Sequence, residues 1–231
     1  MQTDEAESLT EVLRDVGAQV RKDLRLEVRQ LHEVTAVIAF GVISILLFSF
    51  SIGTSARPEQ FAPGVVWVIL FFASVLLFHT TFTREREQGT LGGLRSLPVA
   101  SSVVYVCKIV SGAVLLFAVE AIIVPASMAF LGYAFTAGVL QVLYVFLLGN
   151  LGLAVSAAFV SALTMYTESR TILYPVLMFP LTFPVLAPSI SLTRNLMVGP
   201  SAVGVEANII MLTAASVFIV SVAHFDQIFS D

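Results

Sequence analysis

The chain has 231 residues, of which 57% are hydrophobic and 12% are charged, and its mean hydropathy is +0.92. Soluble domains carry about 25% charged residues, so this composition excludes a soluble globular protein and indicates an integral membrane protein. The net charge of -4 identifies no partner, and a single cysteine, Cys107, excludes an internal disulfide. The acidic start, MQTDEAESL, lacks the basic region and short apolar core of a cleavable signal peptide, so we expect a cytoplasmic N-terminus.

An amphipathic pattern precedes the first long apolar run. Its apolar residues recur every three or four positions, at Leu9, Val12, Leu13, Val16, Val20, Leu24, Val28 and Leu31. Charged residues fill the other faces, which is typical of a helix lying in the membrane interface. We therefore predict a cytoplasmic amphipathic helix over residues 1–33; a soluble coiled coil and a helix packed on a partner domain are the alternatives.

Six apolar runs follow, each long enough to cross a hydrocarbon core, which takes about 20 helical residues. They are Val34–Ile52, Pro63–Phe82, Ser101–Leu131, Thr136–Met165, Thr171–Ser191 and Ala207–Phe225. The third and fourth runs are about ten residues longer than a span requires, so each tilts, projects from the bilayer or breaks. Pro125 favours a break or kink in the third run.

Proline is concentrated in the fifth run, which holds Pro175, Pro180, Pro184 and Pro188. Each proline removes a backbone hydrogen bond, and the carbonyl left over must find a partner inside the protein. The pattern predicts a kinked helix packed against its neighbours. A hinge or cavity-lining role and simple irregular packing both remain open.

The positions of lysine and arginine set the orientation, because cytoplasmic flanks collect these residues. Ten of the twelve lie before the first run, in the second and fourth loops or, for Lys108, near the start of the third run, and only Arg57 and Arg194 lie in the first and fifth loops. Both termini are therefore predicted to be cytoplasmic. We expect a single transmembrane domain over residues 1–231, with a six-helix membrane part over 34–231.

The chemical motifs of several enzyme classes are absent. The sequence contains no G-x-x-x-x-G-K-[ST], no H-E-x-x-H and no G-x-S-x-G, so we expect no enzyme activity in this chain. His32, His79 and His224 map to predicted cytoplasmic ends of spans, which leaves no histidine to bind a metal or haem at the outer face. His79 is a candidate ligand in the inner leaflet, although a histidine there is more often simply hydrogen-bonded.

Glu120 lies near the middle of the third apolar run. An ionised carboxylate at this depth costs on the order of 3 kcal/mol, so the side chain should face the bundle or a cavity, or be protonated. Glu120 is therefore an intramembrane functional candidate. A neutral acid hydrogen-bonded to a neighbouring helix is the structural alternative.

The densest polar cluster is FTREREQGTLGGLRSLP, residues 82–98. Between Gly89 and Pro98, three leucines at three-residue spacing predict a short helix near 89–98 with an apolar ridge. They are Leu91, Leu94 and Leu97, and the charges around them are Arg84, Glu85, Arg86, Glu87 and Arg95. An apolar centre with a polar rim is the anatomy of a docking surface, whereas the alternative is an interfacial helix with its leucines in lipid.

The amphipathic N-terminal helix, the six spans and the E-x-G-[TS]-L-x-x-L segment together resemble the membrane subunits of ABC-2-type transporters. The stretch APGVVWVILFFASVLLFHTTFTREREQGTLGGL, residues 62–94, is similar to the CcmB family, haem exporter protein B of cytochrome c maturation. LRLEVRQ (24–30) and MFPLTFPVLAPS (178–189) are similar to the same family. The positions that carry the resemblance are Pro63, Gly64, Trp67, Lys108, Pro180 and Pro184.

The resemblance implies an ABC-2-type permease fold in which the segment after the second span is a coupling helix that docks on a separate ATPase subunit. The coupling residues would be Arg84, Glu85, Arg86, Glu87, Gly89, Leu91, Leu94, Arg95 and Leu97. It also implies three protein partners: a CcmA-like subunit that binds ATP, a CcmC-like membrane protein that presents haem, and a second copy of this chain. Contact with membrane lipid is expected, and contact with nucleic acid is not.

From these features we expect a cell-membrane subunit that couples ATP hydrolysis in its partner to haem transport or to release of a haem-loaded chaperone. Haem would be a handled ligand and not a covalently bound cofactor, and no metal site is expected. The missing outer-face histidine favours chaperone release. A general ABC-2 permease for a drug, lipid or polysaccharide and a non-transporting scaffold are the alternatives; an ion channel is disfavoured because the spans hold one acid and no filter motif.

Overall fold

A computed structural model describes residues 31–52, 57–79, 101–164, 167, 170–199 and 204–230. All regular structure in these ranges is helical. The helices are α2 (Leu31–Ile52), α3 (Pro58–Phe78), α6 (Ser101–Leu131), α7 (Val139–Thr164), α8 (Arg170–Val198) and α9 (Gly204–Ser230). Most of the predicted N-terminal amphipathic helix and all of the predicted coupling helix near 89–98 lie outside the described residues.

Five helices, α2, α3, α6, α7 and α8, are long and apolar enough to cross a membrane. The last helix, α9, carries a shorter apolar stretch, Ala207–Ala223. The predicted all-helical class and the multi-pass architecture are therefore confirmed. That all six helices cross the bilayer stays a prediction, as does the cytoplasmic location of both termini.

Several helix boundaries differ from the predicted runs, and the local sequence explains two of the differences. Helix α3 begins at Pro58, five residues before the predicted start at Pro63. Proline suits this position because backbone N–H groups in the first turn of a helix have no acceptor within the helix, so the N–H that proline lacks is not missed. Helix α8 continues to Val198 instead of ending at Ser191, and the chain then meets Gly199, a residue common at helix ends. Both differences lengthen helices beyond the apolar run that identified them.

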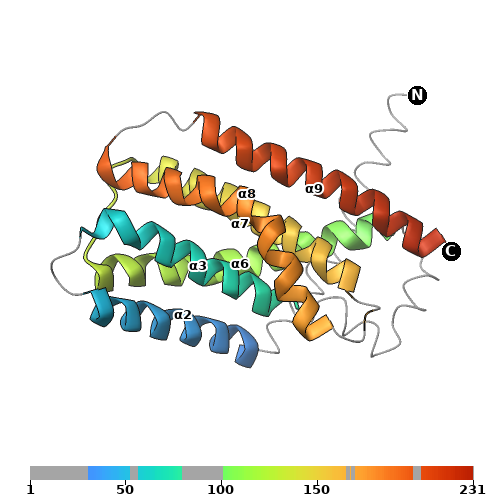
Figure 1. The fold of residues 1–231 in the computed structure, drawn as a ribbon, viewed down its shortest axis with the longest axis horizontal. Coiled ribbons are helices and arrows are strands. Elements are labelled where there is room, and N and C mark those ends of the chain that lie inside the picture. The colour runs from blue at the N-terminus through green and yellow to red at the C-terminus, as the bar shows by residue number, and fades with distance from the viewer. Residues whose placement is uncertain are drawn as a thin grey trace, which may run out of the picture.

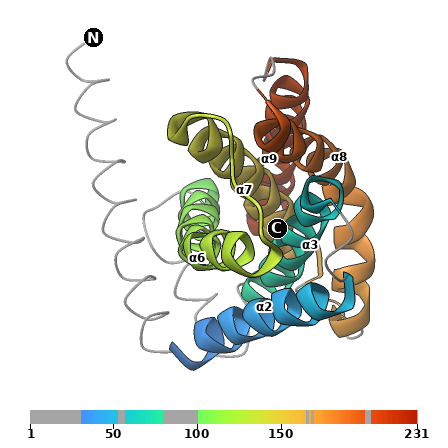
Figure 2. The ribbon, with the colours of Figure 1, turned by 90° about the vertical axis from the view of Figure 1, so that its left-hand side faces the viewer.

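Successive helices run in opposite directions along the bundle, so α3 ends and α6 begins at one end of the molecule (Figure 1). We call this the α3–α6 end and the other the far end. Helices α3 and α7 occupy the middle, with α2 on the outside (Figure 2). Accordingly, 72% of the apolar window of α3 and 61% of that of α7 are buried, against 17% of that of α2.

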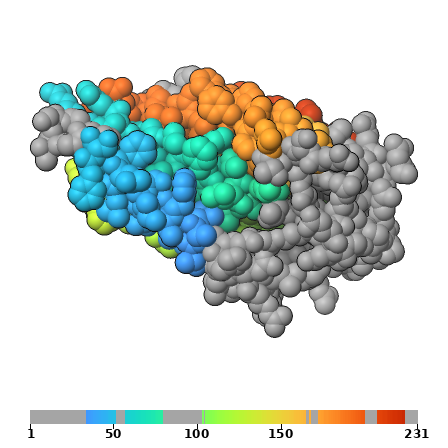
Figure 3. Space-filling view, turned by 60° about the horizontal axis from the view of Figure 1, so that its bottom comes forward, coloured from blue at the N-terminus to red at the C-terminus, as the bar shows by residue number. Residues whose placement is uncertain are grey.

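The outer surface carries many large apolar side chains. Figure 3 shows α2 lying against α3 on one face, with α8 on the other side of α3. On α2, Leu47 is 65% exposed and Phe50 is 85% exposed. Surfaces of this kind are rare in soluble monomers but suit contact with lipid tails.

The two proline expectations have different outcomes. Helix α8 is continuous through its four prolines, and its N-terminal part bends away from the rest of the helix (Figure 1), which confirms the predicted kink. Helix α6 is also continuous through Pro125, so the break considered there does not occur, whereas a kink at Pro125 stays a prediction. Its 31 residues are longer than a bilayer core requires, because a helix of that length measures about 46 Å and the core about 30 Å.

The loop between α6 and α7 closes the far end. The carbonyl of Leu196, in the last turn of α8, accepts from Thr136 N at 3.0 Å, Ala137 N at 3.2 Å and Thr136 Oγ1 at 3.1 Å. A carbonyl at this place in a helix lacks an intrahelical donor, so the loop caps α8.

In the same loop, burial raises the pKa of Tyr133 to about 12, so its hydroxyl stays protonated and shares a 2.6 Å hydrogen bond with Ser127 Oγ.

Candidate functional site

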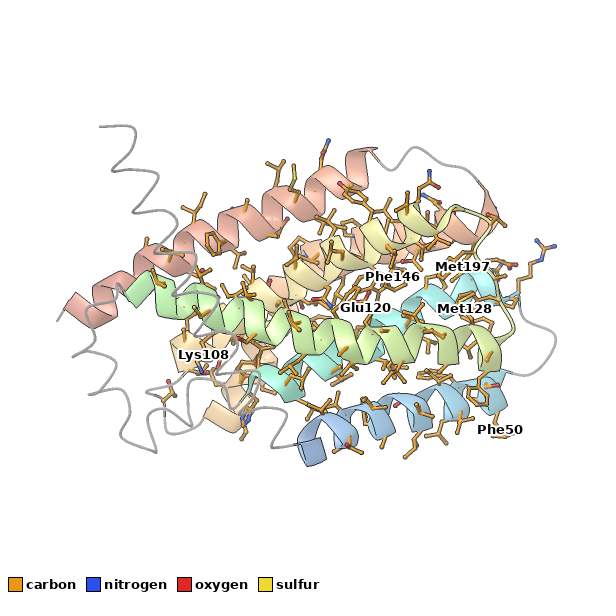
Figure 4. The ribbon with its side chains drawn as sticks, turned by 180° about the vertical axis from the view of Figure 1, so that it is seen from behind. Phe50, Lys108, Glu120, Met128, Phe146 and Met197 are labelled. Carbon is orange, nitrogen blue, oxygen red and sulfur yellow. The ribbon has the colours of Figure 1, made fainter. Side chains whose placement is uncertain are left out.

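The sequence-predicted site residues fall into three groups. The coupling residues, Arg84 to Leu97, lie outside the described residues. The family-motif positions lie on α3, α6 and α8 and do not meet at one place: Pro180 and Pro184 are exposed on α8, whereas Trp67 is fully buried on α3. Lys108 is half-buried in the first part of α6 (Figure 4). The third group is Glu120, inside the bundle.

Trp67 joins three helices. Its indole Nε1 donates to Thr193 Oγ1 of α8 at 2.8 Å, and its ring stacks on Phe146 of α7 with a centroid distance of 5.4 Å. A side chain at Gly149 would overlap this ring, so glycine is what allows α7 to approach α3. In lipid, close packing of small residues and interhelical hydrogen bonds hold helices together. The motif tryptophan is therefore a packing centre.

Two other motif positions, Pro63 and Gly64, lie in the second turn of α3. Pro63 is buried in the second turn, while Gly64 is only half-buried. A Cβ atom added at Gly64 would meet nothing within 4 Å, so packing within the chain does not require glycine there. Nothing in the described residues explains this glycine.

Glu120 forms a buried polar pair with a residue that the sequence analysis did not single out. Asn150 Nδ2 donates to Glu120 Oε2 at 2.8 Å, and the two residues are 2% and 3% exposed. Glu120 lies near the middle of the bundle, close to Phe146 (Figure 4). The expectation that Glu120 faces the bundle is confirmed. The available signal for Asn150 was an amide side chain near the middle of the apolar run of α7.

The Glu120–Asn150 pair and Trp67 meet the same turn of α7. Phe146 and Asn150 are four residues apart, so they lie on one face of the helix, with Gly149 beside them. Within this turn, Phe146 stacks on the Trp67 ring of α3, and Asn150 donates to the Glu120 carboxyl group of α6. The middle of the bundle is thus a junction of α3, α6, α7 and α8.

A second group of contacts lies at the α3–α6 end, and we call it the anchor cluster: Phe78, His79, Gly112, Ser161 and Tyr174. Ser161 Oγ of α7 donates to the carbonyl of Phe78, the last residue of α3, at 2.9 Å. The rings of His79 and Tyr174 meet edge to face at 5.6 Å. A side chain at Gly112 of α6 would overlap the Phe78 ring. The end of α3 is thereby held by α6, α7 and α8.

The anchor cluster also locates His79, the candidate inner-leaflet ligand. The tyrosine that His79 contacts is itself tied to α7, because Tyr174 Oη donates to the carbonyl of Ala157 at 3.2 Å. Across the ranges that the structure describes, no three His, Cys, Asp or Glu side chains come together as a metal site. A ligand role of His79 is an untested expectation.

Long apolar helices, lipid-suited outer faces and a closely packed interior define a multi-pass α-helical protein of the cell membrane. The profile of the family described as CcmB protein matches residues 15–229. The chain therefore belongs to the CcmB family.

Two curated relatives have the same name. The chain is 28% identical over 215 residues to Heme exporter protein B of Rhodobacter capsulatus, an alignment that covers 89% of this chain and 94% of that protein. It is 30% identical over 92 residues to Heme exporter protein B of Escherichia coli strain K12, covering 39% of this chain and 42% of that protein. The similarity to the first relative thus extends over nearly the whole bundle.

The contribution of the Glu120–Asn150 hydrogen bond can be measured with Glu120→Leu, Asn150→Leu and the double variant. Interhelical hydrogen bonds in membranes contribute about 0.6 kcal/mol on average and about 1.7 at most. We expect a coupling energy in this range, because each single variant leaves the other polar group without its partner. Thermal unfolding in detergent is the measurement, and strictly additive effects would contradict the pairing.

Proposed function

We propose that this chain is the membrane subunit of an ATP-driven complex that handles haem during the assembly of c-type cytochromes. The observation that carries the proposal is the match to the CcmB family over residues 15–229. The curated relatives named Heme exporter protein B support it. The activity would be transport or conformational coupling, and the chemistry of ATP hydrolysis would belong to another subunit.

The proposal assigns ATP hydrolysis to a separate subunit and movement of the membrane helices to this chain. Its 231 residues include no phosphate-binding loop, so ATP would be bound and hydrolysed by a CcmA-like partner. The segment 82–98 lies in sequence between α3 and α6, and its leucine spacing and flanking charges predict the apolar centre and polar rim of a docking surface. The proposed contact residues are Arg84, Glu85, Arg86, Glu87, Gly89, Leu91, Leu94, Arg95 and Leu97.

The proposed topology places the α3–α6 end in the cytoplasm, where ATP is available. Ten of the twelve lysines and arginines lie before α2, between α3 and α6, in the first part of α6 or at the start of α8. The alternating directions of the helices bring the ends of α3 and α7 and the starts of α6 and α8 to this same end (Figure 1). Both termini would then be cytoplasmic, and the six helices would form an ABC-2-type permease fold.

Haem would be handled together with other subunits. The three histidines all map to the proposed cytoplasmic ends of spans, so a CcmC-like partner would supply haem ligands at the outer face. We therefore favour ATP-driven release of a haem-loaded chaperone over passage of haem through this chain. A second copy of the chain would complete the membrane part.

The function is tested in a strain from which the gene is deleted. We expect covalent haem in c-type cytochromes, measured by in-gel peroxidase staining, to be lost and then restored by a plasmid copy. The reason is that haem attachment needs every subunit of the assembly complex. Normal staining in the deletion strain would contradict the proposal and favour a general ABC-2 permease.

The docking surface is tested with the double variant Leu91→Asp/Leu94→Asp. We expect at least a tenfold loss of co-purified ATPase subunit, because two carboxylates would replace the apolar centre of the contact, and 1.4 kcal/mol already corresponds to about tenfold. Leu91→Met/Leu94→Met is the matched control, since it preserves volume and apolar character. Intact co-purification and staining with the Asp variant would exclude the docking role.

We also propose that the Glu120 carboxyl group has a functional role, which Glu120→Gln tests. The glutamine carbonyl can still accept from Asn150, so the amount of assembled complex should stay near that of the wild type. We expect haem attachment to fall more than assembly does, because glutamine cannot ionise. Full cytochrome staining with Glu120→Gln would leave Glu120 with a structural role alone.

A further inference from the structure

The segment 80–100 connects the end of α3 to the start of α6 in the sequence. The described residues next to it are His79, directly after α3, and Ser101, the first residue of α6. If the proposed function holds, movement of a docked segment reaches the bundle through these two helix ends. The anchor cluster lies at this point. Phe78 is the last residue of α3 and is fully buried, and His79 is its C-cap.

We infer that the anchor cluster is the joint through which the segment 80–100 moves α6, α7 and α8 together. This inference rests on the proposed function and adds the residues that transmit the movement. Phe78 and His79 position the other helices and contact no substrate in this role. The transmitting contacts differ in kind, and each reaches another helix.

The contact to α6 is steric. Gly112 lies about three turns after the start of α6, and its missing side chain leaves the space that the Phe78 ring fills. Because close-packed groups cannot interpenetrate, displacement of the ring displaces α6. The fit of one ring against one glycine makes this contact sensitive to a single methyl group.

The contact to α7 is a hydrogen bond, and the contact to α8 is an edge-to-face ring contact. Ser161 Oγ, one turn before the end of α7, donates to the Phe78 carbonyl at 2.9 Å. Tyr174, in the first part of α8, contacts the His79 ring and donates to the Ala157 carbonyl of α7 at 3.2 Å. Both hydroxyl groups are buried, so water is not available to replace a broken bond. The three helices therefore follow the end of α3.

The chain supplies a matched control for a test of this joint. Gly112→Ala inserts a methyl group against the Phe78 ring at the α3–α6 end, whereas Gly149→Ala inserts one against the Trp67 ring, in the other half of α3. Both changes overlap an aromatic ring of the same helix. Only the first lies at the proposed joint, so general damage to packing should affect both variants alike.

The experiment compares the two variants in the whole complex, purified through this chain from a deletion strain. Co-purified ATPase subunit and peroxidase-stained cytochrome c are each normalised to the amount of this chain. For Gly112→Ala we expect ATPase binding within twofold of the wild type and at least a fivefold loss of stained cytochrome. For Gly149→Ala, which disturbs the Trp67 contact, we expect a lower yield of assembled complex but less than a twofold loss of stained cytochrome per copy of this chain in the complex.

A second variant keeps the test decisive if Gly112→Ala accumulates poorly. Gly112→Ala/Phe78→Leu replaces the ring with a smaller side chain that can pack against the new methyl group, so the contact between α3 and α6 is kept, and we expect it to recover at least half of the stained cytochrome. Equal losses in the two glycine variants, or no recovery in the double variant, would overturn the inference. Failure of Leu91→Asp/Leu94→Asp to release the ATPase subunit would instead overturn the proposed docking function, so the two failures are distinguishable.

Discussion

The close approach of α3, α7 and α8 around Trp67 is the contact on which the rest of the bundle depends. The indole occupies the space left by Gly149, stacks on Phe146 and donates to Thr193. Lipid tails are as apolar as leucine, so burial alone gives these helices no preference for one another. A complementary shape and a buried hydrogen bond supply that preference, and they place α3 and α7 in the middle.

Several buried hydrogen bonds join one helix to another, whereas most buried serine and threonine hydroxyls donate to a carbonyl of their own helix. Glu120 pairs with Asn150, Trp67 with Thr193, Ser161 with the Phe78 carbonyl, and Tyr174 with the Ala157 carbonyl. A rearrangement of these helices must break or exchange such bonds away from water, where an unpaired polar group is costly. The helices are thus expected to move as discrete packed units, which suits a subunit that converts movement at one end into a change elsewhere.

The family-motif positions divide into residues that build the bundle and residues that the described part of the chain does not explain. Trp67 is central to packing, and the prolines of α8 lie in a helix that is bent but unbroken. Among the described residues, nothing lies within 4 Å of a Cβ atom added at Gly64. A motif glycine that no described neighbour requires leaves room for contact with a partner.

The sequence alone determined the membrane class, the approximate helix positions, the kink in α8 and the inward-facing Glu120, since all of these depend on local composition and the insolubility of charge in lipid. Only the tertiary structure decided that Asn150 is the partner of Glu120, that Trp67 meets Gly149, and that the end of α3, at Phe78 and His79, is held by α6, α7 and α8. Almost every position of these helices is apolar, so periodicity could not tell a lipid-facing side from a buried one. Which residues touch is set by the shapes of side chains far apart in the chain.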